Sequence, residues 1–417
     1  MLTNAARGTK DILPDQINKW DFVEDKFKCQ CKKHGFKEIR TPLFEHTELF
    51  ARGVGDTTDI VQKEMYTFQD HGNRSITLKP EGTASVVRAF LESKQYAETQ
   101  PTKYFYITPC YRYEKPQAGR LREFHQFGVE IFGAKGMLAD IEVISLADDL
   151  LKGYGINNLE LRINSVGCPN CREKYKEALR DYFRPHLNNL CDTCKDRFER
   201  NPMRIIDCKS PEDHELALGA PSILDYLCED CDSSFRELKE GLDAAEISYI
   251  VDPTIVRGLD YYTKTAFEFV SKEIGSQGTV CGGGRYDNLI AEIGDQDIPG
   301  VGFGLGIERL LLLMENKGIE FPEEDSMDAL VITLGDRAKN FGIKLAKDLR
   351  NKGLACDMDS LERNMKGQLK YADRKGYNYA IIIGDNELDS GKCQLKDLKN
   401  SKQEDVAFDE LLDKIRR

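Results

Sequence analysis

The run Arg257–Tyr262 (RGLDYY) places a cation, a glycine and two phenols within six residues. The Arg257 guanidinium is always charged, and its flat fork of donors matches the oxygens of a phosphate or a carboxylate. Tyr261 and Tyr262 could line a pocket for a small planar ligand with polar edges. The other interpretation is an ordinary strand end whose tyrosines lie in the core.

A second segment, residues 111–126, carries three arginines that could bind one polyphosphate. Its centre, Pro116–Gly119, is typical of a β-turn between two antiparallel strands. A hairpin of this kind would bring Arg112, Arg120 and Arg122 toward one ligand. The alternative is a solvated basic hairpin.

Two further segments combine glycines with polar groups. In residues 302–309, alternating glycines lead into a leucine-rich helix near Arg309, so a flat ligand could lie against the backbone. A glycine-packed junction of a strand and a helix would have the same sequence. In residues 78–83, a proline and a glycine favour a turn that could present Glu81 and Thr83 to an ammonium group. Capping of a helix by Thr83 is the alternative there.

Together, these segments resemble one family, the histidyl-tRNA synthetases, which are class II aminoacyl-tRNA synthetases. Three segments resemble class II motifs 1, 2 and 3, namely residues 36–42, 111–126 and 302–313. Four more resemble sequences of the histidine enzyme: residues 7–9 (RGT), 78–83 (LKPEGT), Arg257–Tyr262 and Cys281–Asp287 (CGGGRYD). We expect the glycines of CGGGRYD in a turn that shapes the histidine pocket, since no Gly-Lys-Ser/Thr follows them.

The resemblance implies ATP-dependent ligation of L-histidine to tRNA(His) through a histidyl-adenylate, with Mg²⁺ on the phosphates of ATP. The expected catalytic residues are Arg257 and Arg112, whose charge would neutralise the reacting phosphoryl group. The residues expected to bind ATP are Arg112, Glu114, Arg120, Phe124 and Arg309, with Phe124 and Arg309 on the two faces of the adenine. Those expected to bind histidine are Glu81, Gly82, Thr83, Gln126, Glu130, Arg257, Tyr261 and Tyr262.

The chain departs from the family's pattern at two positions. Lys79 and Lys115 stand where the family usually has arginine, and lysine keeps the charge but loses the bidentate fork. Lys115 and Gln117 resemble loop positions that approach the acceptor end of tRNA, so recognition of that end could be altered.

A different function is a synthetase-like regulatory subunit of histidine biosynthesis, which binds histidine without charging tRNA. Such paralogues tend to lose the catalytic arginine signature and the anticodon domain. This chain keeps Arg257, Arg309 and residues 326–417, which favours the ligase.

The sequence pattern also predicts the helices and strands that must position these groups, and together they indicate an α+β fold. The apolar residues of Pro14–Gly35 recur at steps of three or four, which predicts an amphipathic helix. Short strand-like runs precede turns rather than long helices, which favours an antiparallel sheet flanked by helices. These runs are residues 37–42, 103–108, 160–163, 265–270 and 278–281.

We expect three domains. Residues 1–167 and 248–322 would form a discontinuous class II catalytic domain, and residues 168–247 a mostly helical, cysteine-rich insertion. After the acidic residues 323–325, strands and helices alternate over residues 326–417, which predicts a small α/β domain that resembles the family's anticodon-binding domain. Its strands are expected at residues 329–333, 353–356, 379–383 and 393–395.

The composition is that of a soluble protein, with 40% hydrophobic and 31% charged residues. No apolar run approaches the ~20 residues that span a membrane, so a cytoplasmic protein is expected, and by resemblance a homodimer. The net charge of -12 argues against non-specific binding of nucleic acid. Residues 361–376, however, hold five Lys and Arg against two acids, a candidate RNA contact or a solvated helix face.

Seven of the thirteen cysteines lie in the insertion, and six of these form three CxxC pairs. This spacing suits a structural Zn²⁺ bound by four of them, and reduced structural thiols are the alternative. The seven candidates are Cys168, Cys171, Cys191, Cys194, Cys208, Cys228 and Cys231.

Overall fold

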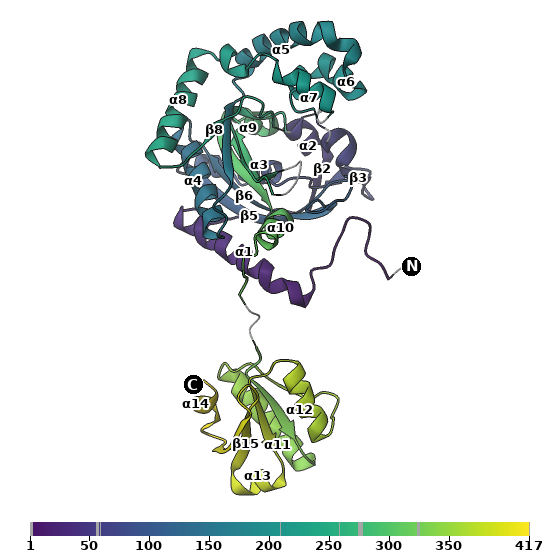
Figure 1. The fold of residues 1–417 in the computed structure, drawn as a ribbon, viewed down its shortest axis with the longest axis vertical. Coiled ribbons are helices and arrows are strands. Elements are labelled where there is room, and N and C mark those ends of the chain that lie inside the picture. The colour runs from purple at the N-terminus through teal and green to yellow at the C-terminus, as the bar shows by residue number, and fades with distance from the viewer. Residues whose placement is uncertain are drawn as a thin grey trace. The chain divides into compact units, whose positions relative to one another are not determined.

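The computed structural model describes residues 3–55, 58, 60–208, 210–257, 259–273, 278–322 and 326–416. The chain forms two compact units, residues 1–322 and 323–417 (Figure 1). Gly258 of the Arg257–Tyr262 run and the acidic residues 323–325 lie outside the described residues. No helix of the described part is long and apolar enough to cross a membrane.

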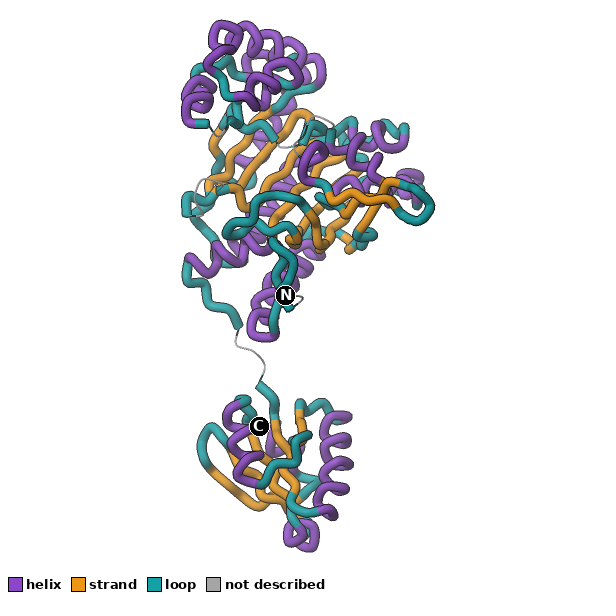
Figure 2. The backbone as a smooth tube through the Cα atoms, turned by 90° about the vertical axis from the view of Figure 1, so that its right-hand side faces the viewer, coloured by secondary structure: helices purple, strands orange, loops and turns teal. Residues whose placement is uncertain are grey.

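An eight-stranded sheet forms the centre of the first unit (Figure 2). Its strands are, in spatial order, β1 (Lys37–Glu38), β5 (Thr102–Tyr111), β6 (Glu123–Phe132), β11 (Gly300–Gly306), β10 (Thr279–Arg285), β9 (Thr263–Val270), β7 (Glu160–Ser165) and β8 (Ile250–Val251). The edge strands β1 and β8 pair in parallel with their neighbours, whereas the strands between them pair antiparallel. The predicted antiparallel sheet is therefore confirmed.

The helices that pack against this sheet include α1 (Pro14–Lys33), α4 (Leu138–Gly153) and α10 (Ile307–Asn316). The predicted amphipathic helix is confirmed as α1, and its apolar stripe is buried from Trp20 to Cys31, while Ile17, near the start of the helix, is 41% exposed. The helix ends at Lys33, and Gly35, directly after the C-cap residue His34, has a φ of 77° that suits glycine. The strand predicted over residues 37–42 was too long, because pairing with β5 stops at Glu38.

A three-stranded sheet of β2 (Phe44–His46), β4 (Ser75–Leu78) and β3 (Tyr66–Gln69) lies in the same unit. Three helices accompany it: α2 (Thr47–Val54), α3 (Thr83–Glu92) and α9 (Leu289–Gly294). Lys79, directly after β4, is buried and donates to the carbonyl and hydroxyl oxygens of Thr41 at 3.3 and 3.1 Å. Its ammonium therefore ties this sheet to residues 36–42.

Residues 168–247 are mostly helical and lie at one end of the unit (Figure 1). The part from Tyr175 to Ile223 forms a separate hydrophobic cluster, whereas Phe235, Leu238 and Leu242 of the last helix join the core of the main sheet. The helices are α5 (Pro169–Phe183), α6 (Asp192–Arg200), α7 (Pro211–Leu218) and α8 (Glu229–Ala244). Short 3₁₀ turns connect them at Arg184–Asn189, Pro202–Ile205 and Ile223–Tyr226.

The second unit is built on a five-stranded mixed sheet. Its strands are, in spatial order, β13 (Cys356–Met358), β12 (Ala329–Thr333), β14 (Tyr379–Ile383), β15 (Lys392–Asp397) and β16 (Lys402–Ala407). Its helices are α11 (Asp336–Asn351), α12 (Met365–Arg374), α13 (Asp385–Ser390) and α14 (Leu411–Ile415). The strand predicted at 353–356 begins only at Cys356, because Gly353, with φ 87°, terminates α11 instead.

Candidate functional site

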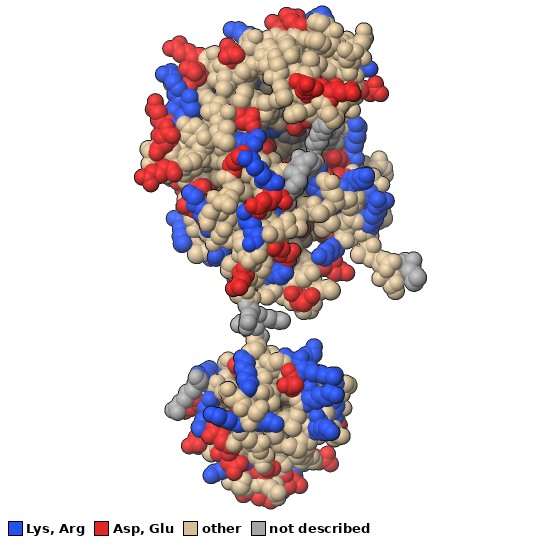
Figure 3. Space-filling view, viewed as in Figure 1, with Lys and Arg blue, Asp and Glu red and all other residues tan. Residues whose placement is uncertain are grey.

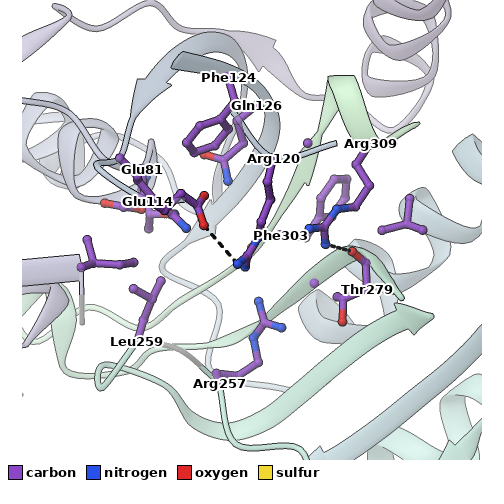
Figure 4. Close-up of a pocket in the computed structure, with 18 of the residues that line it drawn as sticks. Glu81, Glu114, Arg120, Phe124, Gln126, Arg257, Leu259, Thr279, Phe303 and Arg309 are labelled. Atoms are coloured by element: carbon purple, nitrogen blue, oxygen red, sulfur yellow. Dashed lines mark hydrogen bonds and ion pairs between the residues drawn. The ribbon is translucent and has the colours of Figure 1, made fainter. Parts of the chain in front are cut away.

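A cavity of about 260 Å³ lies on the central sheet of the first unit (Figure 4). Eleven of the residues predicted to bind ATP or histidine line it: Glu81, Thr83, Arg112, Glu114, Arg120, Phe124, Gln126, Arg257, Tyr261, Tyr262 and Arg309. Gly82 and Glu130 do not line the cavity, but both bond to residues that do. The fold therefore collects side chains from all four chemistry-bearing segments around one space.

The predicted hairpin of residues 111–126 is confirmed. Strands β5 and β6 pair antiparallel up to Tyr111 and Glu123, and Gln117 and Arg120 exchange backbone hydrogen bonds at the turn. Arg112 Nε donates to the Pro80 carbonyl at 2.8 Å, and its guanidinium lies 5.2 Å from the centre of the Phe124 ring. The hairpin thus delivers Arg112 and Phe124 to the cavity.

Arg122, the third arginine of the hairpin, does not line the cavity. Its guanidinium lies 3.8 Å from the centre of the Tyr113 ring, and its Nε donates to the Glu114 carbonyl at 3.2 Å. Its backbone N–H bonds to Gly8, where an added Cβ would approach the Arg122 stem to 2.7 Å. The prediction that all three arginines meet one ligand was therefore wrong for Arg122, which anchors the N-terminal segment.

Arg120 and Glu114 form an ion pair at 3.0 Å across the hairpin. Figure 4 shows this pair at the cavity, with the side chains of Arg120 and Arg257 extending toward each other. Two residues predicted to contact different parts of ATP are thus partners of each other in the structure.

Arg257 is held by the carboxylate of Glu268 on β9. Its guanidinium carbon lies 5.4 Å from the centre of the Tyr262 ring, and its buried Nε has no hydrogen-bond partner among the described residues. A Cβ at Gly282 would lie 2.5 Å from Arg257 Nη1. Glycine is therefore required at position 282 to admit the arginine.

The turn predicted for the glycines of CGGGRYD was wrong. Residues up to Arg285 belong to the interior strand β10, which pairs with β9 and β11. Gly282 faces Arg257, and a Cβ at Gly284 would lie 2.9 Å from the Tyr262 ring. The glycines leave room for neighbouring side chains rather than bend the chain.

The carboxylate of Glu81 caps helix α3. Its two oxygens accept from the backbone N–H groups of Thr83 and Ala84 at 2.7 and 2.8 Å, and burial raises the pKa of Glu81. Thr83 does not cap the helix; its hydroxyl donates to Glu130 Oε1 at 2.8 Å. Glu81 is thereby fixed at the wall of the cavity with a carboxylate that can also meet a cation.

Glu130 lies behind this wall and is 1% exposed. Besides Thr83, the hydroxyls of Tyr106 (3.0 Å) and Tyr286 donate to its carboxylate. Burial raises the pKa of Glu130 to about 8. Sequence reasoning did not assign a role to either tyrosine, although Tyr286 lies in CGGGRYD. The signal for Tyr106 is Gly128 on the next strand, where a Cβ would lie 2.1 Å from the tyrosine ring.

The alternating glycines of β11 leave room for side chains of the neighbouring strand β6. A Cβ would lie 2.0 Å from Glu130 Oε2 at Gly302 and 2.3 Å from Gln126 Nε2 at Gly304. Gly302 and Gly304 also line the cavity, so the expectation that a flat ligand lies against these glycines stays a prediction. At Gly306 a Cβ would meet no atom closer than 3.9 Å, so space remains there.

Arg309 and Glu308 complete the lining from the start of α10. Arg309 Nη1 donates to the Thr279 carbonyl at 2.6 Å, and burial lowers the pKa of Arg309 (Figure 4). Glu308, Thr279 and His125 were not predicted. Burial opposes the protonation of His125, but the Glu308 carboxylate, 2.9 Å from His125 Nδ1, raises its pKa overall.

The other predicted residues lie outside this cavity. Lys115 and Gln117 lie in the hairpin loop, and Gln117 lines a neighbouring cavity of about 310 Å³ with Trp20 and His125. The seven cysteines of the insertion separate into two groups. Cys168, Cys171, Cys228 and Cys231 form one group, and Cys191, Cys194 and Cys208 join Asp213 in the other.

Comparisons with known proteins agree with this geometry. A family model described as histidyl-tRNA synthetase matches residues 8–171 and 210–310, and a model of an anticodon binding domain matches residues 328–417. The chain is 59% identical to the histidine–tRNA ligase of Caldanaerobacter subterraneus subsp. tengcongensis, over 99% of both chains. It is 57% identical to that of Thermoanaerobacter pseudethanolicus over the whole of both chains.

A crystal structure of apo histidyl-tRNA synthetase from S. aureus is 40% identical and superposes with a TM-score of 0.84. The match covers 99% of this chain and all of that one. With the predicted residues gathered around one cavity of the class II fold, these matches show that the chain belongs to the histidyl-tRNA synthetase family.

Proposed function

We propose that this chain ligates L-histidine to tRNA(His), consuming ATP and releasing AMP and pyrophosphate. The observation that carries the proposal is the convergence of Arg112, Arg120, Arg257 and Arg309 with the carboxylate of Glu81 on one cavity. The family match extends through the anticodon binding domain, and relatives named histidine–tRNA ligase match the whole chain. The regulatory-subunit alternative is therefore not favoured.

In the first step, the histidine carboxylate attacks the α-phosphorus of ATP. The bond from that phosphorus to the leaving pyrophosphate breaks, and histidyl-adenylate forms. No protein nucleophile is needed, so positioning and charge neutralisation carry the rate. Arg112 and Arg257 are the proposed catalytic residues, because both guanidinium groups line the cavity and are held by neighbouring groups.

The ATP subsite is assigned to the hairpin and the start of α10. Phe124 and Arg309 would enclose the adenine, Glu114 would accept from its edge, and Arg120 would bind the outer phosphates. Because Glu114 and Arg120 are paired in the structure, ATP must separate them or bind beside them.

Aminoacyl-tRNA synthetases use Mg²⁺ with ATP, where it neutralises phosphate charge. The lining offers the carboxylate of Glu308, and carboxylate oxygens suit this hard cation.

The histidine subsite is assigned to the opposite wall. Glu81 would accept from the α-ammonium beside Gly82 and Thr83, since its carboxylate is fixed by two backbone N–H groups. Gln126, Tyr261 and Tyr262 line the cavity, and Glu130 lies behind it with a network of hydroxyls. Groups buried in this way reject isosteres of histidine that lack the imidazole nitrogens, because the pocket would keep unpaired polar atoms.

In the second step, the terminal ribose hydroxyl of tRNA attacks the adenylate carbonyl, and AMP leaves. The hairpin loop with Lys115 and Gln117 is the proposed contact for the acceptor end. The second unit would bind the anticodon, and Lys and Arg side chains gather on its α12 side (Figure 3). Lys366, Lys370 and Arg374 are exposed at four-residue steps, so they share one face of this helix.

We further propose that the protein acts in the cytoplasm as a homodimer and that residues 168–247 form a distinct insertion in the catalytic domain. Apolar side chains are exposed beside the motif 1 segment, at Leu43, Phe44 and Phe68, as a subunit contact requires. All thirteen cysteines are free thiols, which suits a reducing compartment. Light scattering after size exclusion at micromolar concentration should give twice the 47.4 kDa chain mass.

The deciding experiment is ATP–pyrophosphate exchange with each of the twenty amino acids, followed by charging of tRNA(His). Exchange with histidine alone and acylation of tRNA(His) are expected. A folded protein that binds histidine without exchange would be a regulatory subunit and would refute the proposal.

A further inference from the structure

The cysteines of the insertion form two compact four-ligand groups. In the first, which we call the neck cluster, Cys168 Sγ lies 3.5 Å from Cys171 Sγ and 3.9 Å from Cys228 Sγ, and Cys231 completes the set. In the second, the lobe cluster, Cys191 Sγ lies 3.9 Å from Cys208 Sγ, and Cys208 Sγ lies 3.4 Å from Asp213 Oδ2; Cys194 is the fourth member. Within each cluster all four ligand atoms lie within 4.8 Å of one another.

These distances fit a single tetrahedral ion. Zn–S bonds of about 2.3 Å place tetrahedral sulfur ligands about 3.8 Å apart. A disulfide would hold its two sulfurs at about 2.0 Å, far closer than any pair here. An iron–sulfur cluster would hold its cysteines farther apart, because its own irons and sulfides lie between them.

Each cluster also lies where two helices begin. Cys168 and Cys228 are the N-cap residues of α5 and α8, and Cys171 and Cys231 follow in the first turns. In the lobe cluster, Cys191 is the N-cap of α6, and Asp213 lies in the first turn of α7. Helix N-termini favour negative charge, which stabilises the thiolate and carboxylate forms that a metal needs.

Backbone donors already point at the ligand atoms. The N–H of Cys228 donates to Cys171 Sγ at 3.1 Å, and the N–H of Cys191 donates to both carboxylate oxygens of Asp213 at 3.2 Å. Such second-shell bonds orient metal ligands and offset the negative charge of a thiolate site.

The three cysteines of the lobe cluster lie outside the residues that the histidyl-tRNA synthetase model matches. That model matches residues 8–171 and 210–310, so Cys191, Cys194 and Cys208 lie in the stretch between the two matched parts.

Both clusters lie beside residues that hold the loop of Tyr261 and Tyr262. Arg172, next to Cys171, donates to the carbonyl oxygens of Asp260 and Tyr262 at 3.3 and 3.1 Å. Arg204, between Cys194 and Cys208 in the chain, donates to Asp260 Oδ1 at 3.0 Å. A metal ion that fixes the two clusters would therefore also fix Arg172 and Arg204, whose hydrogen bonds hold the loop of Tyr261 and Tyr262 at the cavity.

We propose that the insertion binds two structural Zn²⁺ ions, one at the neck cluster through four cysteines and one at the lobe cluster through three cysteines and Asp213. The neck ion joins the start and the end of the insertion, and the lobe ion joins α6 to α7. Together they position Arg172 and Arg204 against the loop 259–262. This positioning role rests on the proposed function, whereas the zinc content does not.

The test is the metal content of the full-length protein, purified with a thiol reductant and supplemented with Zn²⁺. Two equivalents of zinc per chain are expected for the wild type and for Cys29→Ser, an exposed cysteine outside both clusters. Cys171→Ser and Cys194→Ser should each retain one equivalent. A wild-type content below one tenth of an equivalent overturns the proposal, and a content of one equivalent overturns the two-site assignment.

Two measurements remain decisive if a serine variant fails to fold. A mercurial thiol reagent should release two Zn²⁺ from the wild type, and release of none overturns the proposal. With Co²⁺ in place of zinc, Asp213→Cys should intensify the sulfur-to-metal charge-transfer band, because a fourth thiolate joins the lobe ion. An unchanged band overturns the ligand assignment at that cluster.

For the positioning role, Cys194→Ser should raise the KM for histidine several-fold in pyrophosphate exchange and leave the KM for ATP unchanged. If the KM values for histidine and for ATP change equally, or if neither changes, the proposed positioning role of the zinc ions is overturned. Zinc bound at two equivalents by a protein without exchange would refute the proposed function and leave the metal sites standing.

Discussion

Arg120 Nη1 lies 3.0 Å from Glu114 Oε2, so two residues assigned to different ends of ATP neutralise each other at the mouth of the hairpin. Arg120 is 34% exposed at its side chain, and the pair is open to solvent screening. The ion pair between Arg120 and Glu114 is therefore weak, and the more highly charged phosphates of ATP can displace Glu114 as the partner of Arg120.

Arg120→Ala should raise the KM for ATP about tenfold, because a charge-assisted hydrogen bond to a phosphate is lost. The melting temperature should stay close to that of the wild type, since the Arg120 side of the pair is 34% exposed and such ion pairs contribute little to folding. The KM for ATP is measured by pyrophosphate exchange at varied ATP concentration. Arg74→Ala, which removes an exposed arginine paired with Asp70 outside the cavity, is the matched control and should leave the KM unchanged. An equal effect of both variants would contradict the assignment.

Arg257→Ala should slow histidine-dependent exchange about 10²–10³-fold, the usual cost of losing one donor to a developing charge. Gly282→Ala should slow it about 10–100-fold, because the new Cβ would lie 2.5 Å from Arg257 Nη1 and must displace it. Gly153→Ala is the control, since a Cβ there meets no atom within 4 Å. Wild-type rates in Gly282→Ala would show that the position of Arg257 is not critical.

The raised pKa of Glu130 should make the free energy of unfolding of the protein depend on pH. Its pKa of about 8 in the folded chain lies above the ordinary value of about 4.3, so the folded state binds the proton more tightly. The stabilisation is fully present below about pH 4 and is lost as the pH rises through about 8. Between pH 6 and pH 9 the wild type should lose on the order of 2 kcal/mol that Glu130→Gln does not lose.

Urea denaturation of both proteins at the two pH values measures this difference. Glu92→Gln, an exposed position on α3, should keep the wild-type pH profile. An identical pH dependence in wild type and Glu130→Gln would show that Glu130 does not titrate in this range.

Arg285→Met should destabilise the fold by about 3–5 kcal/mol, because it leaves the buried carboxylate of Asp140 without its cation. Arg285 is 1% exposed, and its Nε lies 3.1 Å from Asp140 Oδ2. Denaturant unfolding gives the change in free energy. Arg337→Met, which breaks an exposed pair with Asp389 in the second unit, should be nearly neutral. A neutral Arg285→Met would mean that the core accommodates the lone carboxylate.

Charge reversal on α12 should weaken tRNA binding without touching the adenylate step. Lys366→Glu combined with Lys370→Glu should raise the KM for tRNA and lower the salt dependence of binding by about two phosphate contacts. Exchange without tRNA should be unchanged. Lys392→Glu with Lys402→Glu, exposed positions on β15 and β16, keeps the same net charge and serves as the control. An equal loss in the control would show a general charge effect.

The sequence by itself determined the type of most elements and the identity of eleven of the residues that line the cavity. Helical periodicity predicted α1, and the turn residues Pro116–Gly119 predicted the β5–β6 hairpin, because both signals are local. Arg112, Arg257 and Arg309 line the cavity, as the resemblance to the synthetase family led us to expect, because that resemblance rests on short local motifs. The three CxxC pairs made a metal site a hypothesis on local spacing alone, and the metal itself stays a prediction.

Only the tertiary structure decided which groups meet. It turned Arg122 away from the cavity, placed the CGGGRYD glycines within a strand, and surrounded Glu130 with Tyr106 and Tyr286. It also divided seven cysteines into two clusters and brought Asp213 into one of them. These contacts join residues far apart in the chain, so they depend on strand order and register, which local pattern does not encode.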